Sequence, residues 1–167
     1  MKVDKLTTAH DRSTFRCGRD ELDEWFRTAA RQAGQRNRSV RTTVLVDDRA
    51  VVGSTLLATR AVAFRAAPQQ LMRGVPRHDA VPAVRRARLA IHEDRQGQGL
   101  GERLLASAVH EVLAAAEHVG IVLMAVDALD EAVAAFTARY GFVRIETQQA
   151  RPALAARIKD LQATLGR

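Results

Sequence analysis

A short apolar run that leads into a glycine-dense turn constrains this chain more than any other feature. Arg88-Leu89-Ala90-Ile91-His92 is followed, four residues on, by Gln96-Gly97-Gln98-Gly99-Leu100-Gly101, where a long helical pattern begins. A strand that enters a helix through such a turn gathers backbone N–H groups at the positive end of the helix dipole. Glycines permit positive φ there and let a ligand approach without an intervening Cβ. The sequence therefore predicts an anion-binding turn.

Two common nucleotide-binding motifs do not fit this turn. The P-loop needs Lys-Ser/Thr after its second glycine, whereas Glu102 and Arg103 follow Gly101. The dinucleotide motif G-x-G-x-x-G fails because Glu102 stands at its third glycine. Read as Gln96-x-x-Gly99-x-Gly101 after a strand, the turn resembles the acyl-CoA pyrophosphate loop of the GNAT N-acetyltransferases. The alternative is a turn that merely joins a strand to a helix.

Length and composition favour a single domain over residues 1–167, because 167 residues with 47% hydrophobic residues suffice for one compact core. No run approaches the roughly 18 apolar residues of a membrane span, and the N-terminus lacks the apolar stretch of a signal peptide. We expect a cytoplasmic protein with no membrane association. The single Cys17 has no Cys or His partners at ligand spacing, so we expect no metal and a packed or half-exposed thiol.

The net charge of +7 comes from 26 basic and 19 acidic residues, and nearly all of the basic residues are arginines. Because the guanidinium pairs with phosphate in two-point geometry, a polyanionic partner is one interpretation. A generally solvated surface with an arginine-rich codon bias is the other. The densest basic stretch lies on and after the first predicted helix: Arg27, Arg31, Arg36, Arg38 and Arg41.

Periodicity along the rest of the chain predicts alternating helices and strands. Strands are expected at 2–7, 42–46, 51–58, 60–65, 121–126, 142–147 and 153–158, besides the apolar run before the glycine turn. Helices are expected from Asp20 to Gly34 with Trp25 in the core, from Leu100 to about His118, after an Asp130 N-cap up to Gly141, and at 159–165. The stretch 66–84 contains three prolines and is expected to be a loop, with a short helix at 69–73.

This order of elements resembles the whole GNAT fold, an α/β (α+β) class with a mixed sheet of about six to seven strands flanked by helices. Within that superfamily the chain is similar to the acetyltransferase toxins of type II toxin–antitoxin pairs, which acetylate the α-amino group of aminoacyl-tRNA. The matching residues are Phe15-x-Cys17-Gly18-x-x-x-Leu22-Asp23-x-Trp25, Arg41-Thr42, Ala87-Arg88-Leu89-Ala90, Val126-Asp127-Ala128, Phe136-x-x-x-Tyr140-Gly141-Phe142 and Thr147-Gln148-Gln149.

The resemblance implies an acetyl-CoA site made of backbone groups. Those of Leu89, Ala90 and Ile91 are expected to hydrogen-bond the pantetheine arm, as an added strand would. The amides of Gln96, Gly97, Gln98, Gly99, Leu100 and Gly101 are expected to hold the pyrophosphate. Phosphates of the tRNA are expected to contact the basic stretch above together with Arg85 and Arg86.

One position departs from the family pattern. Thr137 follows Phe136 where the toxins have a tyrosine, whose hydroxyl is the expected general acid for the departing thiolate. A threonine hydroxyl is a far poorer acid than phenol. Tyr140, three residues on, is a second candidate, or else a core residue before Gly141. The alternatives are a slowed enzyme, a proton from water or from Tyr140, or a form altered to remove toxicity.

The function expected from the resemblance is acetyl transfer from acetyl-CoA to aminoacyl-tRNA, which blocks translation. The expected partners are aminoacyl-tRNA, a small antitoxin with a DNA-binding head, and a second copy of the chain in a homodimer. An ordinary GNAT enzyme that acetylates a small amine or a protein N-terminus is an alternative. A module that binds acetyl-CoA or RNA without turnover is another, because of Thr137.

Overall fold

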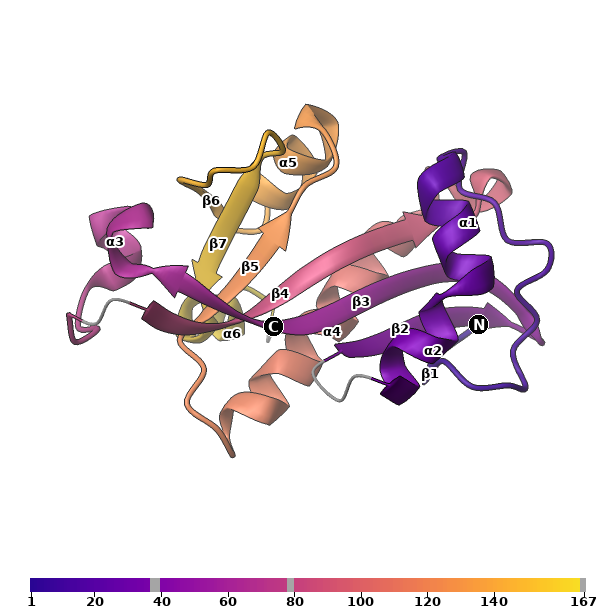
Figure 1. Cartoon of the computed structure of the whole chain (residues 1–167), viewed down its shortest axis with the longest axis horizontal. Helices are drawn as coiled ribbons and strands as arrows, with labels where there is room; N and C mark the ends of the chain where they lie inside the picture. The colour runs from indigo at the N-terminus through magenta and orange to yellow at the C-terminus, as the bar shows by residue number, and fades with distance from the viewer. Residues whose placement is uncertain (37–39, 78–79, 166–167) are drawn as a thin grey trace. The chain divides into compact units, whose positions relative to one another are not determined.

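The computed structural model describes residues 1–36, 40–77 and 80–165. Within these residues the strands form a seven-stranded sheet in the order β1-β2-β3-β4-β5-β7-β6, so the predicted mixed sheet of six to seven strands is confirmed. The elements shown in Figure 1 are β1 (Lys2–Lys5), α1 (Asp20–Thr28), α2 (Ala30–Arg36), β2 (Val40–Asp47), β3 (Ala50–Ala63), η1 (Phe64–Ala66), α3 (Gln69–Met72), β4 (Ala80–Ile91), η2 (Glu93–Arg95), α4 (Leu100–Ala116), β5 (Leu123–Asp127), α5 (Glu131–Ala138), β6 (Val143–Ile145), β7 (Ala153–Arg157) and α6 (Ile158–Leu165).

The chain divides into two compact units, one formed by Met1–Ala58 with Arg88–Ala108 and the other by Thr59–Ala87 with Val109–Arg167. The division falls within β3, β4 and α4, so these three elements contribute to both units. That residues 1–167 behave as a single domain stays a prediction.

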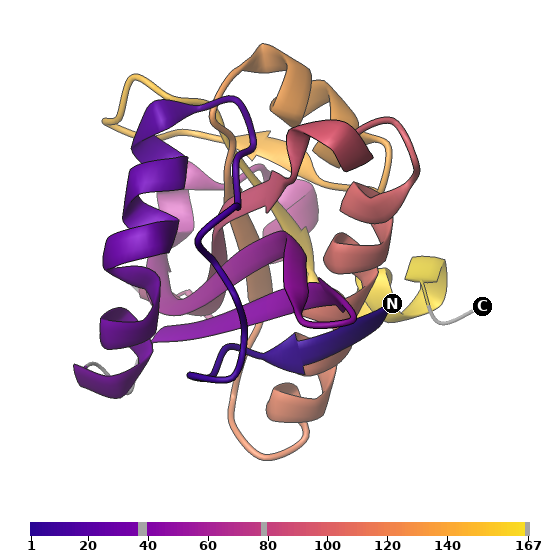
Figure 2. The ribbon, with the colours of Figure 1, turned by 90° about the vertical axis from the view of Figure 1, so that its right-hand side faces the viewer.

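The first unit contains the antiparallel strands β1, β2 and the first part of β3. The predicted hairpin is confirmed, because β2 and β3 pair across a turn in which Asp48 has a φ of 55°. Helices α1 and α2 lie along one face of these strands, and the segment that joins β1 to α1 runs alongside α1 (Figure 2). Because side chains alternate along a strand, Val44 packs in the cluster of Phe26 whereas Leu45 packs in that of Leu104.

The apolar periodicity predicts one helix from Asp20 to Gly34, but the structure has two, with the break at Ala29. A contact from outside the helix accounts for this break. The guanidinium of Arg12 donates a 2.8 Å hydrogen bond to the carbonyl of Phe26. That carbonyl is the acceptor that the amide of Ala30 would use in an uninterrupted α-helix.

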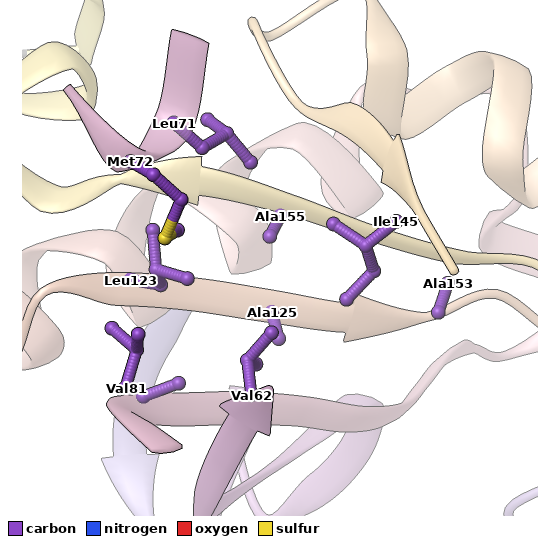
Figure 3. Close-up of a cluster of buried hydrophobic side chains, with 10 residues drawn as sticks. Val62, Leu71, Met72, Val81, Leu123, Ala125, Ile145, Ala153 and Ala155 are labelled. Carbon is purple, nitrogen blue, oxygen red and sulfur yellow. The ribbon is translucent and has the colours of Figure 1, made fainter. Parts of the chain in front are cut away.

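The second unit surrounds β5, β6 and β7. β4 pairs with β5 in parallel, whereas β7 pairs antiparallel with both β5 and β6. Leu71 and Met72 of α3 pack over one face of these strands (Figure 3). The strand residues in this cluster are every second residue, such as Leu123 and Ala125 of β5. This face is a core of small and medium-sized apolar side chains.

Two strands are longer than the sequence indicates. The runs 51–58 and 60–65 were predicted as separate strands, but β3 is continuous from Ala50 to Ala63, since no glycine or proline stands where the two runs meet. β4 begins at Ala80, which shortens the predicted loop 66–84. Pro82 lies inside β4, and its carbonyl accepts a 3.0 Å hydrogen bond from the amide of Val122.

The end of the chain follows the prediction closely. Asp130 is the N-cap of α5, and its carboxylate accepts a 3.0 Å hydrogen bond from the amide of Val133. The helix ends at Ala138, so Tyr140 lies in the turn beyond it, before Gly141 with a φ of 87°. No helix in the described parts of the chain is long and apolar enough to cross a membrane.

Candidate functional site

The predicted pyrophosphate loop lies between η2 and the N-terminus of α4. Gly97 and Gly99 have φ values of 73° and 74°, and a Cβ added at either would meet no atom within 4 Å. The four residues Gln96–Gly99 are exposed, and α4 begins at Leu100. Unpaired amides of the first helical turn thus adjoin an open loop at the positive end of a 17-residue helix. This arrangement fits a diphosphate.

The arginines nearest the loop are engaged with other groups. Arg95 forms a 2.9 Å ion pair with Asp47, and Arg103 donates a 3.0 Å hydrogen bond to the carbonyl of Met1. Backbone amides, rather than these side chains, are therefore the groups of the loop that are left to bind an anion.

An N-terminal segment that the sequence analysis did not connect with the loop holds its entry in place. The carbonyl of Arg16 accepts a 2.8 Å hydrogen bond from the amide of Glu93. The carboxamide of Gln96 donates 3.0 Å hydrogen bonds to the carbonyls of both Cys17 and Ile91. The family block around Cys17 is therefore part of the support of the loop.

Asp23 fixes that block from within α1. Its side chain is only 4% exposed, and its carboxylate accepts a 2.8 Å hydrogen bond from the amide of Cys17. Gly18, with a φ of 82°, makes the turn between them. An acidic residue beside the apolar stripe of a predicted helix was the signal that could have identified this role.

The Cys17 thiol is buried rather than reactive. Burial, followed by the neighbouring Asp23 carboxylate, raises the pKa of Cys17 to about 11. A thiol with so high a pKa carries little thiolate near neutral pH, which fits the packed thiol expected from the sequence.

Arg88 marks an irregularity in β4. Its φ is 58°, a left-handed conformation that is uncommon for a residue other than glycine. Its guanidinium lies over the ring of Trp25, 4.6 Å from the ring centroid, so Trp25 is half-buried rather than fully in the core.

The predicted pantetheine-binding residues Leu89, Ala90 and Ile91 lie in β4 after the segment that pairs with β5, which covers Ala83–Arg86. Their side chains pack in the cores of the first unit, which leaves backbone groups for a ligand.

Thr137 is placed as a structural group. It has 0% exposure, and its hydroxyl donates a 2.7 Å hydrogen bond to the carbonyl of Val133 in its own helix. The same hydroxyl lies 3.4 Å from Nη2 of Arg86, from which it accepts a hydrogen bond. Its proton is thus bound to the backbone, which argues against the catalytic role considered for Thr137.

Tyr140, the second candidate acid, is half-buried in the turn after α5. Its ring packs edge-on against Phe136 at 5.2 Å between centroids, and the guanidinium of Arg139 lies 6.0 Å from it.

The predicted RNA-binding arginines do not form one uniform exposed set. Arg86 is only 2% exposed, which runs against a phosphate contact, and burial lowers its pKa to about 10. Arg85 forms a 3.0 Å ion pair with Asp127, which also binds Arg60 at 2.6 Å. The pairing of these two arginines with Asp127 was not foreseen.

The other predicted arginines lie in the first unit. Arg27 is exposed and donates to the carbonyl of Phe15 at 3.2 Å, Arg31 is half-buried and Arg41 is exposed. Arg36 is the last residue of α2, and Arg38 lies outside the described residues.

A further group of arginines lines a surface pocket in the second unit. The pocket has a volume of about 970 Å³ and is bordered by Phe64, Gln69 and Gln70 among others. Arg65, Arg73 and Arg77 line it, and all three are exposed. The sequence predicted Arg65 at the end of a strand and the other two arginines in the stretch 66–84, and it assigned none of the three a role.

Comparisons with known proteins agree with this geometry. The family model described as acetyltransferase (GNAT) domain matches residues 39–144. A tRNA-acetylating toxin from Mycobacterium tuberculosis is 32% identical over 162 residues, which cover 97% of this chain and 95% of that protein.

Two solved structures are similar over nearly the whole chain. AtaT complexed with acetyl-methionyl-tRNAfMet has a TM-score of 0.87 and 28% identity, and the match covers 97% of each chain. A Tyr-to-Phe variant of the toxin AtaT, bound to acetyl-CoA and the C-terminus of the antitoxin AtaR, has a TM-score of 0.83 and 27% identity, covering 99% of this chain and 98% of that one. The chain belongs to the GNAT acetyltransferase family.

Proposed function

We propose that this chain transfers the acetyl group of acetyl-CoA to the α-amino group of aminoacyl-tRNA and thereby acts as a translation-blocking toxin. The observation that carries this proposal is the 32% identity, over 97% of the chain, to a tRNA-acetylating toxin. The similarity to AtaT in complex with acetyl-methionyl-tRNAfMet supports the same class of substrate.

The loop before α4 fits acetyl-CoA, which a similar structure contains. Gly97 and Gly99 leave open space at positive φ, and the α4 N-terminus supplies amides for the pyrophosphate. Backbone groups of Leu89, Ala90 and Ile91 would hold the pantetheine arm. When bound, acetyl-CoA supplies an activated acetyl group. The acceptor amine must be neutral to attack it, and we expect water to take up the amine's proton.

The tRNA would be held by arginines, since phosphate contacts dominate affinity for nucleic acids. Of the residues predicted for this surface, Arg27, Arg31, Arg36, Arg38 and Arg41 remain in the proposal, whereas Arg85 and Arg86 are withdrawn. Changing Arg36, Arg38 and Arg41 to Gln should weaken tRNA binding and reduce its salt dependence. Each phosphate that is no longer neutralised should lower the salt slope by about 0.7–0.9.

The matched control for that experiment removes the same charge elsewhere. Arg65, Arg73 and Arg77, which line the pocket beside α3, are changed to Gln together. If only this control set lowers the salt slope, the RNA surface lies at the pocket. If neither set does, both are ordinary solvated surface.

The proposal includes an antitoxin partner, a homodimer and action in the cytoplasm. A toxin similar to this chain has been solved with the C-terminus of its antitoxin. An arginine-rich surface suits an acidic segment that folds on binding. A neighbouring reading frame that encodes a small protein with a DNA-binding head would support this part, and its absence would favour an ordinary acetyltransferase.

The transfer itself is tested with acetyl-labelled acetyl-CoA and three kinds of acceptor. These are aminoacyl-tRNA, uncharged tRNA as a control, and a panel of small amines and peptide N-termini. We expect label on aminoacyl-tRNA alone. Label found only on small amines or peptides would replace the toxin by an ordinary GNAT enzyme.

A binding module without turnover is the second candidate. Two facts favour it: Thr137 stands where the toxins are expected to carry the tyrosine acid, and the Thr137 side chain is fully buried. Calorimetry separates the two candidates. Binding of acetyl-CoA with no turnover on any acceptor would support the module, whereas no binding at all would contradict both.

A further inference from the structure

A second surface pocket lies in the first unit and gathers positive charge. It has a volume of about 630 Å³, and Arg12, Arg27 and Arg49 line it together with His10 and Asp11. Arg27 and Arg49 are exposed, and Arg12 is half-buried. We call it the N-terminal arginine pocket. None of these residues belongs to the glycine loop, and only Arg27 was predicted to contact a ligand.

Main-chain hydrogen bonds join two walls of this pocket. The amide of Asp11 donates a 3.1 Å hydrogen bond to the carbonyl of Arg49, and the carbonyl of Asp11 accepts one of 3.2 Å from the amide of Val51. The segment before α1 is thereby fixed to the turn between β2 and β3, which carries Arg49. The pocket is therefore part of the folded unit and not a gap beside a loose loop.

Two of the three guanidinium groups are held in place by carbonyls. Nη1 of Arg12 donates a 2.8 Å hydrogen bond to the carbonyl of Phe26, and Nη1 of Arg27 donates one of 3.2 Å to the carbonyl of Phe15. A guanidinium carries five N–H donors. Both side chains are thus oriented in advance and keep donors for a ligand.

The positive charge of the pocket is not balanced by carboxylates. Among the described residues, Asp11 is the one acidic residue that lines it. Its Oδ1 accepts hydrogen bonds of 2.9 Å and 2.7 Å from the amide and the hydroxyl of Ser13 instead. Within the described parts of the chain, Arg12, Arg27 and Arg49 form no ion pair with a carboxylate.

A fourth arginine adds to this excess. Burial, followed by the positive charge of Arg31 on α2, lowers the pKa of Arg12. The Nε atom of Arg31 is buried and has no hydrogen-bond partner among the described residues. Neighbouring charges of the same sign disfavour each other, so an anion bound here would offset a repulsion that the protein leaves in place.

We propose that the N-terminal arginine pocket binds a terminal phosphate monoester of one of the two substrates, either the 3′-phosphate of coenzyme A or the 5′-phosphate of tRNA. This inference rests on the proposed function. Three arginines against one carboxylate give the lining a net charge of +2 when His10 is neutral. A phosphate monoester carries about −1.5 to −2 near pH 7, whereas a phosphodiester of the tRNA backbone carries one negative charge. Guanidinium groups pair with phosphate oxygens in two-point geometry.

Both phosphates belong to ends of the substrates that the proposed reaction brings to this protein. The segment that lines the pocket continues to Arg16 and Cys17, whose carbonyls bind Glu93 and Gln96 at the entry of the predicted pyrophosphate loop. In coenzyme A the 3′-phosphate stands on the ribose next to the pyrophosphate. In tRNA the 5′-phosphate lies at the same end of the molecule as the aminoacyl group.

Calorimetry on the full chain with two matched pairs of ligands tests the site and identifies the source of the phosphate. The first pair is coenzyme A and dephospho-coenzyme A, which lacks only the 3′-phosphate. The second pair is tRNA with and without its 5′-phosphate. We expect loss of the phosphate to weaken binding by about tenfold or more in one pair, as loss of a hydrogen bond to a charged group does.

Variants link that difference to the pocket. Arg49→Gln and Arg27→Gln each remove one guanidinium, and we expect both to reduce the difference in affinity between the two ligands of the responding pair. Arg49 is exposed and its side chain forms no hydrogen bond among the described residues, so Arg49→Gln keeps the test valid if Arg27→Gln does not fold. Arg144→Gln is the matched control, because it removes an exposed arginine of the second unit that pairs with Glu131; it should leave the difference unchanged.

The outcomes separate this inference from the proposed function. Equal affinities within both pairs for the wild-type protein would overturn the phosphate site. A difference that stays at its wild-type size in Arg49→Gln and Arg27→Gln would overturn it as well. In either case binding of dephospho-coenzyme A and of tRNA would leave the proposed function standing. Absence of binding for all four ligands would overturn both.

Discussion

Cys17 joins the N-terminal block to the glycine loop through its main chain. Its amide is bound by Asp23 and its carbonyl by Gln96. The N-terminal block of matching residues thus has a structural task, which is to hold the entry of the predicted pyrophosphate loop.

The raised pKa of the Cys17 thiol predicts that the stability of the protein depends on pH. Burial and the Asp23 carboxylate raise its pKa from 9.0 to about 11. Between these values the unfolded chain has lost the proton while the folded protein keeps it, so stability falls as pH rises from about 9 to about 11. Unfolding by denaturant at several pH values checks this. Cys17→Ala should remove the part of the decline that belongs to the thiol, and identical declines in both proteins would contradict the assignment.

The contact between Thr137 and Arg86 predicts how a larger side chain at position 137 changes the free energy of unfolding. Thr137→Tyr introduces a phenol at a position with 0% exposure beside the guanidinium, and overpacking of this kind costs about 1–3 kcal/mol. Because the two residues are in contact, the cost should be at least about 0.5 kcal/mol smaller in the presence of Arg86→Leu. Denaturant unfolding of the four proteins measures this coupling.

The control for that cycle introduces the same tyrosine on the same helix. Ala138 is exposed, so Ala138→Tyr should change the free energy of unfolding by no more than about 0.5 kcal/mol. Strict additivity of Thr137→Tyr and Arg86→Leu would mean that the two side chains do not compete for space.

Individual residues were predicted unevenly. Asp130 was identified as an N-cap because its type and place before a periodic run have a local cause. The burial of Arg86 was not predicted, because it depends on the packing of β4 against α5. The pairing of Arg85 with Asp127 was not predicted either, because it joins β4 to β5. Sequence position alone made both arginines look like surface charges.

At the scale of elements, Gly53 of β3 leaves room for the tips of two buried side chains. A Cβ at Gly53 would lie 2.9 Å from the Cδ1 atoms of both Ile91 and Leu104. Gly53→Val should therefore destabilise the protein by about 1–3 kcal/mol, because buried side chains would have to move. Gly120→Val is the matched control, since a Cβ at Gly120 meets nothing within 4 Å. Thermal unfolding checks the difference, and equal effects would contradict the packing argument.

The glycine loop predicts an effect on binding. Gly99 has a φ of 74°, so Gly99→Ala strains the backbone by about 1–2 kcal/mol although the space is open. We expect a tenfold or greater loss of acetyl-CoA affinity, measured by calorimetry. Gly74, with a φ of 77° and equally open space, lies outside the loop. Gly74→Ala should leave that affinity unchanged, and an equal loss in both variants would mean that the loop has no special part in binding.

The elements themselves were largely predictable, because their causes are local. Turn residues, glycine stops and two kinds of periodicity placed β1, β2, β5, β6 and β7 within a few residues, whereas β3 and β4 are longer than predicted. The break between α1 and α2 was not visible, since it depends on Arg12 reaching the carbonyl of Phe26 from a distant segment. The continuity of β3 was missed as well, because the periodicity was divided into two strands on either side of Thr59.

At the scale of the whole molecule, the family and the pyrophosphate loop followed from one glycine pattern and the order of elements. The seven-stranded sheet and the GNAT family match agree with that prediction. The acceptor surface could not be derived in the same way. A net charge of +7 says that a polyanion is attracted, but it does not say which arginines face solvent and which are paired or buried.

The central claim is that the acetyl acceptor is the amino group of an aminoacyl-tRNA. It is tested most directly in a cell-free translation reaction that receives the protein and acetyl-CoA, by releasing the amino acids from recovered tRNA and weighing them by mass spectrometry. The account predicts that translation stops and that amino acids from the tRNA carry one acetyl group on nitrogen. Unmodified amino acids on the tRNA, recovered while the same preparation acetylates small amines or protein N-termini, would contradict it.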